Sequence, residues 1–169
     1  MADKFVTIAA GVRKLREFIT TSAGALDSGK AIALNASGQV DATMLPSNIS
    51  NDRTMTASET LAAADIVNAW DDSGTVKVRK ADATATGKKG VGFVQSGITA
   101  AATGTVSFEG TITGLSGLTE GADYFLSTTA GAITATAPSA SGNVVQFIGV
   151  ALSATELLFV PDTHPIVIE

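Results

Sequence analysis

Short apolar segments separated by glycine-containing turns fill the chain from residue 53 to its end. Apolar and polar residues alternate in residues 75–79 (Thr-Val-Lys-Val-Arg) and again in residues 105–109 (Thr-Val-Ser-Phe-Glu). Alternation of this kind places successive side chains on opposite faces of a strand. The segments recur roughly every 8–12 residues, and no helical pattern of about 10–15 residues lies between them. The pattern therefore favours antiparallel β-structure and argues against a parallel α/β sheet.

The predicted fold class is mainly β: a compact antiparallel β-barrel or β-sandwich over residues 53–169, with an extended N-terminal arm. Turns such as residues 71–74 and 87–90 connect the strands, because glycine readily adopts the positive φ angles that tight turns need. No internal repeat of fixed period is visible in the sequence. The predicted strands are residues 54–57, 65–70, 75–80, 91–95, 105–109, 124–127, 132–136, 144–152 and 156–161.

Residues 1–52 follow a different pattern and are predicted to form an arm or hairpin followed by a linker. The apolar residues at helical spacing are Ile8, Val12, Leu15 and Ile19. Gly11 interrupts that spacing, and the apolar residues on its two sides fit a hairpin equally well. Residues 5–19 are therefore either a helix or a hairpin, and we favour the hairpin.

The remainder of this N-terminal region holds little that could form a core. Residues 30–34 are predicted to be a short strand, and residues 47–52 a polar linker. A segment that cannot bury enough apolar surface to offset its conformational entropy becomes ordered only when it binds something else. We therefore expect the arm to pack on another surface.

The residue types that most often carry out catalysis are scarce. The chain has no Cys, and its single His, His164, precedes Pro165 near the C-terminus, where a solvated side chain is expected. Without Cys the chain has no thiolate nucleophile, zinc–thiolate site or disulfide. Histidine is the most common general acid or base near neutral pH. We therefore expect no catalytic residues, no metal site and no cofactor, and a protein that is not an enzyme.

Charged residues are few and unevenly distributed. They make up 16% of the chain, against about 25% in typical globular domains. A surface poor in charge suits a protein whose surface is largely covered by neighbouring subunits. The net charge of −5 argues against a nucleic-acid partner. Most of the basic residues form one group near the N-terminus (Arg13, Lys14 and Arg16) and a second group further on (Lys77, Arg79, Lys80, Lys88 and Lys89), and none follows Lys89.

One glycine-rich segment imitates a phosphate-binding loop. Gly24, Gly29 and Lys30 fit the spacing G-x-x-x-x-G-K. Position 31, which would need Ser or Thr to hold Mg²⁺, is Ala, and residues 35–38 read as a turn where a helix should continue. We therefore do not expect a nucleotide site.

The sequence shows no membrane-spanning segment and no export signal. No apolar run approaches the roughly 20 residues of a membrane-spanning helix. Residues 1–4 (Met-Ala-Asp-Lys) lack the apolar core of a signal peptide. We expect synthesis in a cytoplasm and no membrane partner.

Three groups of segments together carry a resemblance to a known family. They are residues 21–30 with 33–41 and 44–46; residues 61–68 with 76–81; and residues 114–127 with 131–134 and 146–151. The combination resembles structural proteins of tailed bacteriophages, particularly the capsid decoration (cement) protein family. The third group also resembles β-domains of phage fibres. The chain departs from the pattern at Ala64, where the resemblance leads us to expect Gly before Asp65.

The resemblance implies a structural virion protein on the outer surface of a phage capsid, made in the cytoplasm of the host bacterium. Such a protein clamps neighbouring major capsid subunits together and is commonly a homotrimer. The implied partners are therefore the major capsid protein and further copies of the chain itself. The alternative function is a receptor-binding or fibre-associated β-domain of a phage tail or head. The residues expected to contact the capsid are Phe5, Val6 and Ile8 as apolar anchors and Arg13, Lys14 and Arg16 as polar contacts.

Overall fold

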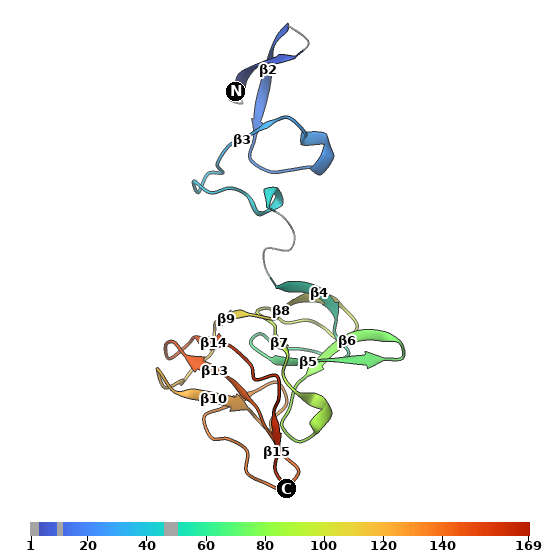
Figure 1. Cartoon of the computed structure of the whole chain (residues 1–169), viewed down its shortest axis with the longest axis vertical. Coiled ribbons are helices and arrows are strands. Elements are labelled where there is room, and N and C mark those ends of the chain that lie inside the picture. Colours follow the sequence, from blue (N-terminus) through green and yellow to red (C-terminus); the bar gives the residue numbers. More distant parts are fainter. Residues whose placement is uncertain (1–3, 10–11, 46–50) are drawn as a thin grey trace. The chain divides into compact units, whose positions relative to one another are not determined.

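The computed structural model describes residues 4–9, 12–45 and 51–169 and divides the chain into two units (Figure 1). The N-terminal unit is Met1–Ser50 and the C-terminal unit is Asn51–Glu169. The boundary that we predicted, after residue 52, lies two residues beyond this division and inside β4 (Asp52–Thr56), the first strand of the C-terminal unit. Residues 46–50, most of the predicted linker, lie outside the described part of the chain.

The N-terminal unit is a small three-stranded sheet. Strand β1 (Lys4–Ala9) pairs antiparallel with β2 (Val12–Ile19), and β2 pairs parallel with the two-residue β3 (Ala31–Ile32). Two short 3-10 turns, η1 (Gly24–Asp27) and η2 (Ala42–Met44), complete the unit. The hairpin that we favoured for residues 5–19 is thus confirmed, and the helix is not formed.

The C-terminal unit contains two five-stranded antiparallel sheets and one two-stranded pair. The first sheet has the order β4-β8-β7-β5-β6, formed by β4 (Asp52–Thr56), β5 (Ile66–Asp72), β6 (Thr75–Lys80), β7 (Gly92–Phe93) and β8 (Thr103–Ser107); η3 (Thr86–Lys88) lies between β6 and β7. The second has the order β11-β10-β13-β14-β9, formed by β9 (Gly110–Ile112), β10 (Asp123–Leu126), β11 (Ile133–Thr134), β13 (Phe147–Ala151) and β14 (Leu157–Phe159). The pair is β12 (Val144–Val145) with β15 (Ile166–Val167).

The mainly β, antiparallel prediction is confirmed, whereas no closed barrel forms among the described residues. One isolated parallel bridge, between Ala57 and Val78, joins the residue after β4 to the other edge strand of the first sheet. The predicted strand over residues 144–152 is wrong in one respect, because it is two strands, β12 and β13. The chain changes pairing partner at the buried Gln146, which lies between them.

Two apolar clusters form the core. One contains residues from both five-stranded sheets, including Ile66 and Phe93 of the first sheet and Phe159 of the second. The rings of Phe93 and Phe159 meet edge to face, with 5.1 Å between their centroids. The other cluster contains residues of the first sheet, such as Val67, and of the segments beside its strands, such as Val94. Because consecutive residues point to opposite faces of a strand, the central strands of the first sheet are buried on both sides.

The two five-stranded sheets have the same topology. Read from β6, the first sheet runs β6-β5-β7-β8-β4; read from β11, the second runs β11-β10-β13-β14-β9. In each sheet, the first strand in the chain lies at one edge, a hairpin follows, and the next two strands fill the gap between them. The structure therefore contains a repeat that is not visible in the sequence as a fixed period.

The registers of the two halves also agree. Val67 on β5 is paired with Gly92 on β7, and Tyr124 on β10 is paired with Gly149 on β13. Both members of the second pair lie 57 positions after their counterparts in the first. The C-terminal unit is thus a structural duplication, and we call residues 51–108 its first half and residues 109–169 its second half.

Main-chain hydrogen bonds before the hairpins repeat with the same shift. The N–H of Ala64 donates to the carbonyl of Val94 at 2.7 Å, and the N–H of Gly121 donates to that of Ala151 at 2.8 Å. Ala64 has a φ of 67° and Gly121 a φ of 75°. The turn therefore needs the left-handed conformation, which glycine adopts without strain and alanine does not. Ala64 therefore replaces the expected glycine at a position where the backbone conformation favours glycine.

Candidate interaction surface

The hairpin register divides the predicted contact residues between two faces. Val6 is paired with Leu15 and Ile8 with Arg13, whereas Phe5 is paired with Arg16. Directly paired residues of an antiparallel ladder share a face, and successive residues alternate between faces. Val6, Ile8 and Arg13 therefore lie on one face of the hairpin, while Phe5, Lys14 and Arg16 lie on the other.

The first of these faces, which we call the open face, presents apolar side chains to solvent. The exposed fractions are 63% for Val6, 70% for Ile8 and 69% for Leu15. At one end of this face Lys4 forms an ion pair with Glu17, with 3.6 Å between Nζ and Oε1. Arg13 lies at the other end. The open face is thus an apolar patch with charged ends.

The second face of the hairpin is partly used inside the N-terminal unit. The rings of Phe5 and Phe18 are tilted against each other with 5.0 Å between their centroids. The guanidinium of Arg16 donates a hydrogen bond from Nη1 to the carbonyl of Gly29 at 3.0 Å, which ties the segment after η1 to β2. Among the predicted polar contacts, Arg16 therefore has a structural role, while Arg13 and Lys14 are exposed.

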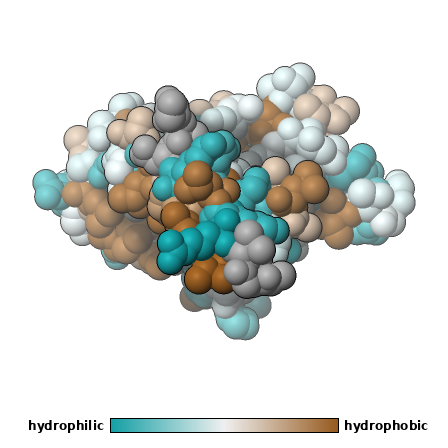
Figure 2. All heavy atoms as spheres, turned by 90° about the horizontal axis from the view of Figure 1, so that it is seen from above, coloured by the Kyte–Doolittle hydropathy of each residue, from teal (hydrophilic) through white to brown (hydrophobic). Residues whose placement is uncertain are grey.

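No residue whose burial is described in the N-terminal unit is buried. Its exposed apolar side chains are Val6, Ile8, Leu15, Phe18, Leu26, Ile32, Leu34, Val40 and Leu45. Figure 2 shows apolar residues at the molecular surface beside hydrophilic ones on the face that it draws. A hairpin with so little burial is at best marginally stable alone in water.

Polar contacts order the connection between β2 and β3 in place of a core. Asp27 accepts hydrogen bonds from the Lys30 ammonium and from the Ala23 N–H, both at 2.5 Å. The hydrogen bond from Lys30, and after it the one from Ala23, lowers the pKa of the Asp27 carboxyl below its ordinary value. The lysine of the imitation phosphate loop is therefore paired with a neighbouring carboxylate.

Most basic residues of the second group (residues 77–89) form ion pairs or other contacts within the C-terminal unit. The ion pairs are Lys77 with Asp72 (2.8 Å), Lys80 with Asp65 (3.1 Å) and Lys88 with Asp82 (2.8 Å). The guanidinium carbon of Arg79 lies 4.6 Å from the ring centroid of Trp70, and Nη2 donates to the carbonyl of Gly87. This group stabilises strands and turns, which leaves it less suited to bind a partner than Arg13 and Lys14.

The titratable residues do not converge on a chemical site in the part of the chain that the structure describes. His164 is exposed, and its Nδ1 lies 2.8 Å from the hydroxyl of Thr163. Residues 4–9, 12–45 and 51–169 contain no cluster of His, Asp and Glu arranged to hold a metal ion. Over the same ranges no helix has the length and apolar character needed to cross a bilayer.

Leu15 is the contact candidate that the sequence reasoning missed. Its position opposite Val6 follows from the register of β1 with β2. Helical spacing groups Leu15 with Ile8 but not with Val6. A count outward from residues 10 and 11 together pairs Ala9 with Val12 and Val6 with Leu15, and this count is the signal that could have found it.

Comparison with known proteins identifies no family for this chain. No model of a known protein family matches it, and no curated protein matches it.

Proposed function

We propose that the chain is a structural, non-catalytic virion protein that binds the outer surface of a phage capsid and clamps neighbouring major capsid subunits. The observation that carries the proposal is the N-terminal unit, a hydrogen-bonded hairpin that exposes Val6, Ile8 and Leu15 on one face and buries none of them. Covering these side chains would release apolar surface from water, which is favourable at roughly 25 cal/mol per Å². The resemblance to decoration proteins supplies the partner.

The charge distribution supports a polar orientation of the molecule. Arg13 is exposed at one end of the apolar open face and Lys14 is exposed on the other face of the hairpin, while the chain after Lys89 carries acidic residues and no basic ones. In this proposal the basic, apolar hairpin contacts the shell and the acidic C-terminal unit faces solvent. Complementary charge then sets the orientation and speeds association more than it adds affinity.

The remaining parts of the proposal concern the C-terminal unit. We infer that its two five-stranded sheets, which share one apolar cluster, form a sandwich rather than a barrel. We also infer that the chain acts as a homotrimer. Three hairpins held together bind a shell with an avidity that a single weak contact does not reach.

The test uses capsids from a phage that lacks the gene for this chain. Purified full-length protein is added, saturable binding is measured by co-sedimentation, and the melting of the capsid is followed by calorimetry. We expect saturable binding, a higher capsid melting temperature, and loss of both when residues 1–19 are deleted. Val76→Ser is the matched control, because Val76 is an exposed apolar residue (60%) of the C-terminal unit.

Two outcomes would overturn the proposal. Unchanged capsid affinity after deletion of residues 1–19 would show that the hairpin is not the contact. Absence of capsid binding together with saturable binding to host cells would favour a receptor-binding role.

A further inference from the structure

The two halves of the C-terminal unit differ at one sheet edge, which is covered in the first half and uncovered at Ile133 in the second. This difference indicates a binding site. The difference lies at the outer edge of the hairpin strand, β6 in the first half and β11 in the second. Val78 on β6 faces Ala69 across its ladder, and Ile133 on β11 faces Leu126, which lies 57 positions after Ala69. Val78 and Ile133 are therefore equivalent residues.

In the first half the outer edge is occupied by the chain itself. The residues after β4 run parallel to β6, with a bridge between Ala57 and Val78. The N–H of Ser58 donates to the carbonyl of Val78 at 2.8 Å, and the N–H of Lys80 donates to Oε1 of Glu59 at 2.9 Å. Three consecutive residues thus cover the edge of β6.

In the second half the same edge is open at Ile133, although Gly131 just before β11 is hydrogen-bonded to Ile66 and Ala81. The N–H of Ser127 donates to the carbonyl of Ala132, and the N–H of Leu126 donates to Gln146 on the far side of β10. Hydrogen-bonded and non-hydrogen-bonded pairs alternate along an antiparallel ladder. Since Ser127 and Ala132 are hydrogen-bonded, the next pair, Leu126 and Ile133, is not. The N–H and carbonyl of Ile133 therefore point away from β10. Within residues 51–169, which are all described, neither group forms a hydrogen bond outside the β10–β11 ladder.

The connecting segment is too short to close this edge. Arg53 and Ile112 are equivalent, since they face the equivalent residues Val106 and Leu157. Arg53 precedes Ala64 by eleven positions, whereas Ile112 precedes the equivalent Gly121 by nine. The shorter segment is held instead by the turn between β13 and β14, through hydrogen bonds from Leu115 to Thr155 (3.1 Å) and from Leu118 to Ala154 (3.2 Å).

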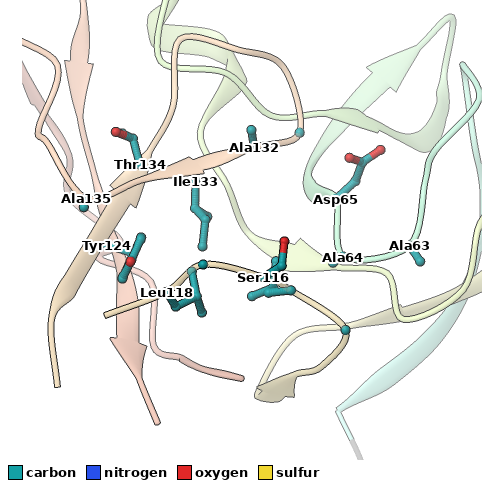
Figure 3. A pocket seen from close by; sticks show the side chains of 14 residues that line it. Ala63, Ala64, Asp65, Ser116, Leu118, Tyr124, Ala132, Ile133, Thr134 and Ala135 are labelled. Carbon is teal, nitrogen blue, oxygen red and sulfur yellow. The ribbon is translucent and has the colours of Figure 1, made fainter. Parts of the chain in front are cut away.

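An open pocket of about 530 Å³ results, bounded by β11 and its flanking residues on one side and by residues 114–118 on the other. Figure 3 shows Ile133 pointing across it toward the segment that carries Ser116 and Leu118, with Asp65 at the far end. Asp65 already accepts a hydrogen bond from the Ala62 N–H and pairs with Lys80. The carboxylate of Asp65 is therefore already in use, whereas the outward N–H and carbonyl of Ile133 are not.

We propose that this pocket is a docking site for an extended peptide segment of another protein, which adds as a strand beside β11. The structure also specifies the chemistry of the segment, because the first half shows what fills the equivalent place. The segment has two consecutive small residues and then a carboxylate, as in Ala57-Ser58-Glu59. The carboxylate accepts from the N–H of Ala135, the equivalent of Lys80.

This site is independent of the hairpin on which the proposed capsid contact rests. Main-chain hydrogen bonds to Ile133 provide the affinity, and the small side chains provide the specificity, as in other strand additions at a sheet edge. Asp65 disfavours a second carboxylate at the end where the segment enters.

The experiment uses the full chain, labelled with ¹⁵N, and an acetylated and amidated peptide with the sequence of residues 54–60 (Thr-Met-Thr-Ala-Ser-Glu-Thr). We expect saturable shifts of the Ile133 and Ala135 amide signals and slower hydrogen exchange at Ile133. A peptide with proline at the position of Ser58 lacks the N–H that meets Ile133 and should bind at least about tenfold more weakly.

A filled pocket provides the matched control. Ser116→Trp places a large side chain in the pocket from an exposed position, and Ser141→Trp makes the same change at an exposed position outside it. Binding should be lost only in Ser116→Trp, at an unchanged melting temperature. Equal binding to both variants, or no shift of Ile133 at millimolar peptide, overturns the proposal. Shifts at Ile133 that depend on the concentration of the chain alone would assign the pocket to a second copy and overturn it as well.

Discussion

Gly92 and Gly149 occupy equivalent positions in the two halves of the C-terminal unit, and each lies against a main-chain carbonyl of the next strand. A Cβ on Gly92 would lie 2.8 Å from the carbonyl oxygen of Ser107, and a Cβ on Gly149 would overlap the carbonyl oxygen of Leu158. Neither glycine has a positive φ. Close approach of the backbone, rather than a turn, therefore excludes a side chain at both positions.

We predict that Gly149→Ala lowers the free energy of unfolding by about 3 kcal/mol and Gly92→Ala by about 1–2 kcal/mol, because a backbone carbonyl cannot move aside as a side chain can. Gly87→Ala is the control, since nothing lies within 4 Å of its added Cβ. Urea unfolding measures all three. Equal stability of Gly149→Ala and Gly87→Ala would contradict the register of β13 with β14.

Ala64 gives a prediction in the opposite direction. Its φ of 67° costs roughly 1 kcal/mol for an L-residue with a Cβ, and its equivalent Gly121 has a φ of 75° with nothing within 4 Å. Ala64→Gly should therefore raise the melting temperature, and Gly121→Ala should lower it by a similar free energy. A fall in stability for Ala64→Gly would show that contacts of the methyl group with the core outweigh the backbone strain.

The same duplication shows what the sequence could and could not reveal. Strand β6 was predicted with both ends correct, because residues 75–79 alternate and follow the predicted turn at residues 71–74. The repeat stayed hidden because equivalent core positions hold different residues, such as Val67 and Tyr124. The connections also differ in length, so no single period applies to the whole unit.

The sequence predicted which residue types form the candidate surface, but it did not predict which face of the hairpin each residue occupies. The apolar character of Phe5, Val6 and Ile8 is plain in the sequence, yet which of them remain exposed depends on cross-strand register and on the contact between Phe5 and Phe18. Apolar patterning specifies a two-strand register only weakly when both faces carry apolar residues. The structural role of Arg16 was hidden for a related reason, since its partner Gly29 is thirteen residues away.

Asp82 makes the stability of the C-terminal unit depend on pH in the acid range. Burial raises the pKa of this carboxyl, but hydrogen bonds from Lys88 and Thr84 outweigh that effect, so the pKa lies below its ordinary value of 3.8. The stabilisation is therefore complete above pH 3.8 and is lost as the pH falls through the lower pKa of the folded state.

We predict that Asp82→Asn lowers the free energy of unfolding by a constant amount above pH 3.8, and that the gap to the wild type narrows below it. Urea unfolding at a series of pH values measures the gap. Lys88→Met should raise the pKa of Asp82 and shift the narrowing to higher pH. A gap that does not change with pH would show that packing or hydrogen bonding, and not ionisation, is responsible.

Gln146 is a buried amide that joins two segments as a strand would. Its Oε1 accepts from the Gly90 N–H, and its Nε2 donates to the carbonyls of Gly90 and Asp162, each at 2.8 Å. Gln146→Leu leaves these backbone groups without partners, which should lower the free energy of unfolding by about 3 kcal/mol. The control is Gln95→Leu, because Gln95 binds backbone groups that water can reach, and it should cost less than about 1 kcal/mol.

The two faces of the N-terminal hairpin should respond differently to substitution. Leu15→Ser changes an exposed side chain of the open face, so the stability of the free protein should change by less than about 0.5 kcal/mol. Phe18→Ser removes the contact with Phe5, which is worth about 0.5–1.5 kcal/mol beyond the burial of the rings. Limited proteolysis of the free protein should therefore cut the N-terminal unit of Phe18→Ser faster than that of Leu15→Ser. In the capsid-binding assay, Leu15→Ser should bind the capsid more weakly than the wild type although its hairpin is intact. Wild-type affinity in Leu15→Ser would mean that the open face is not the surface that meets the shell.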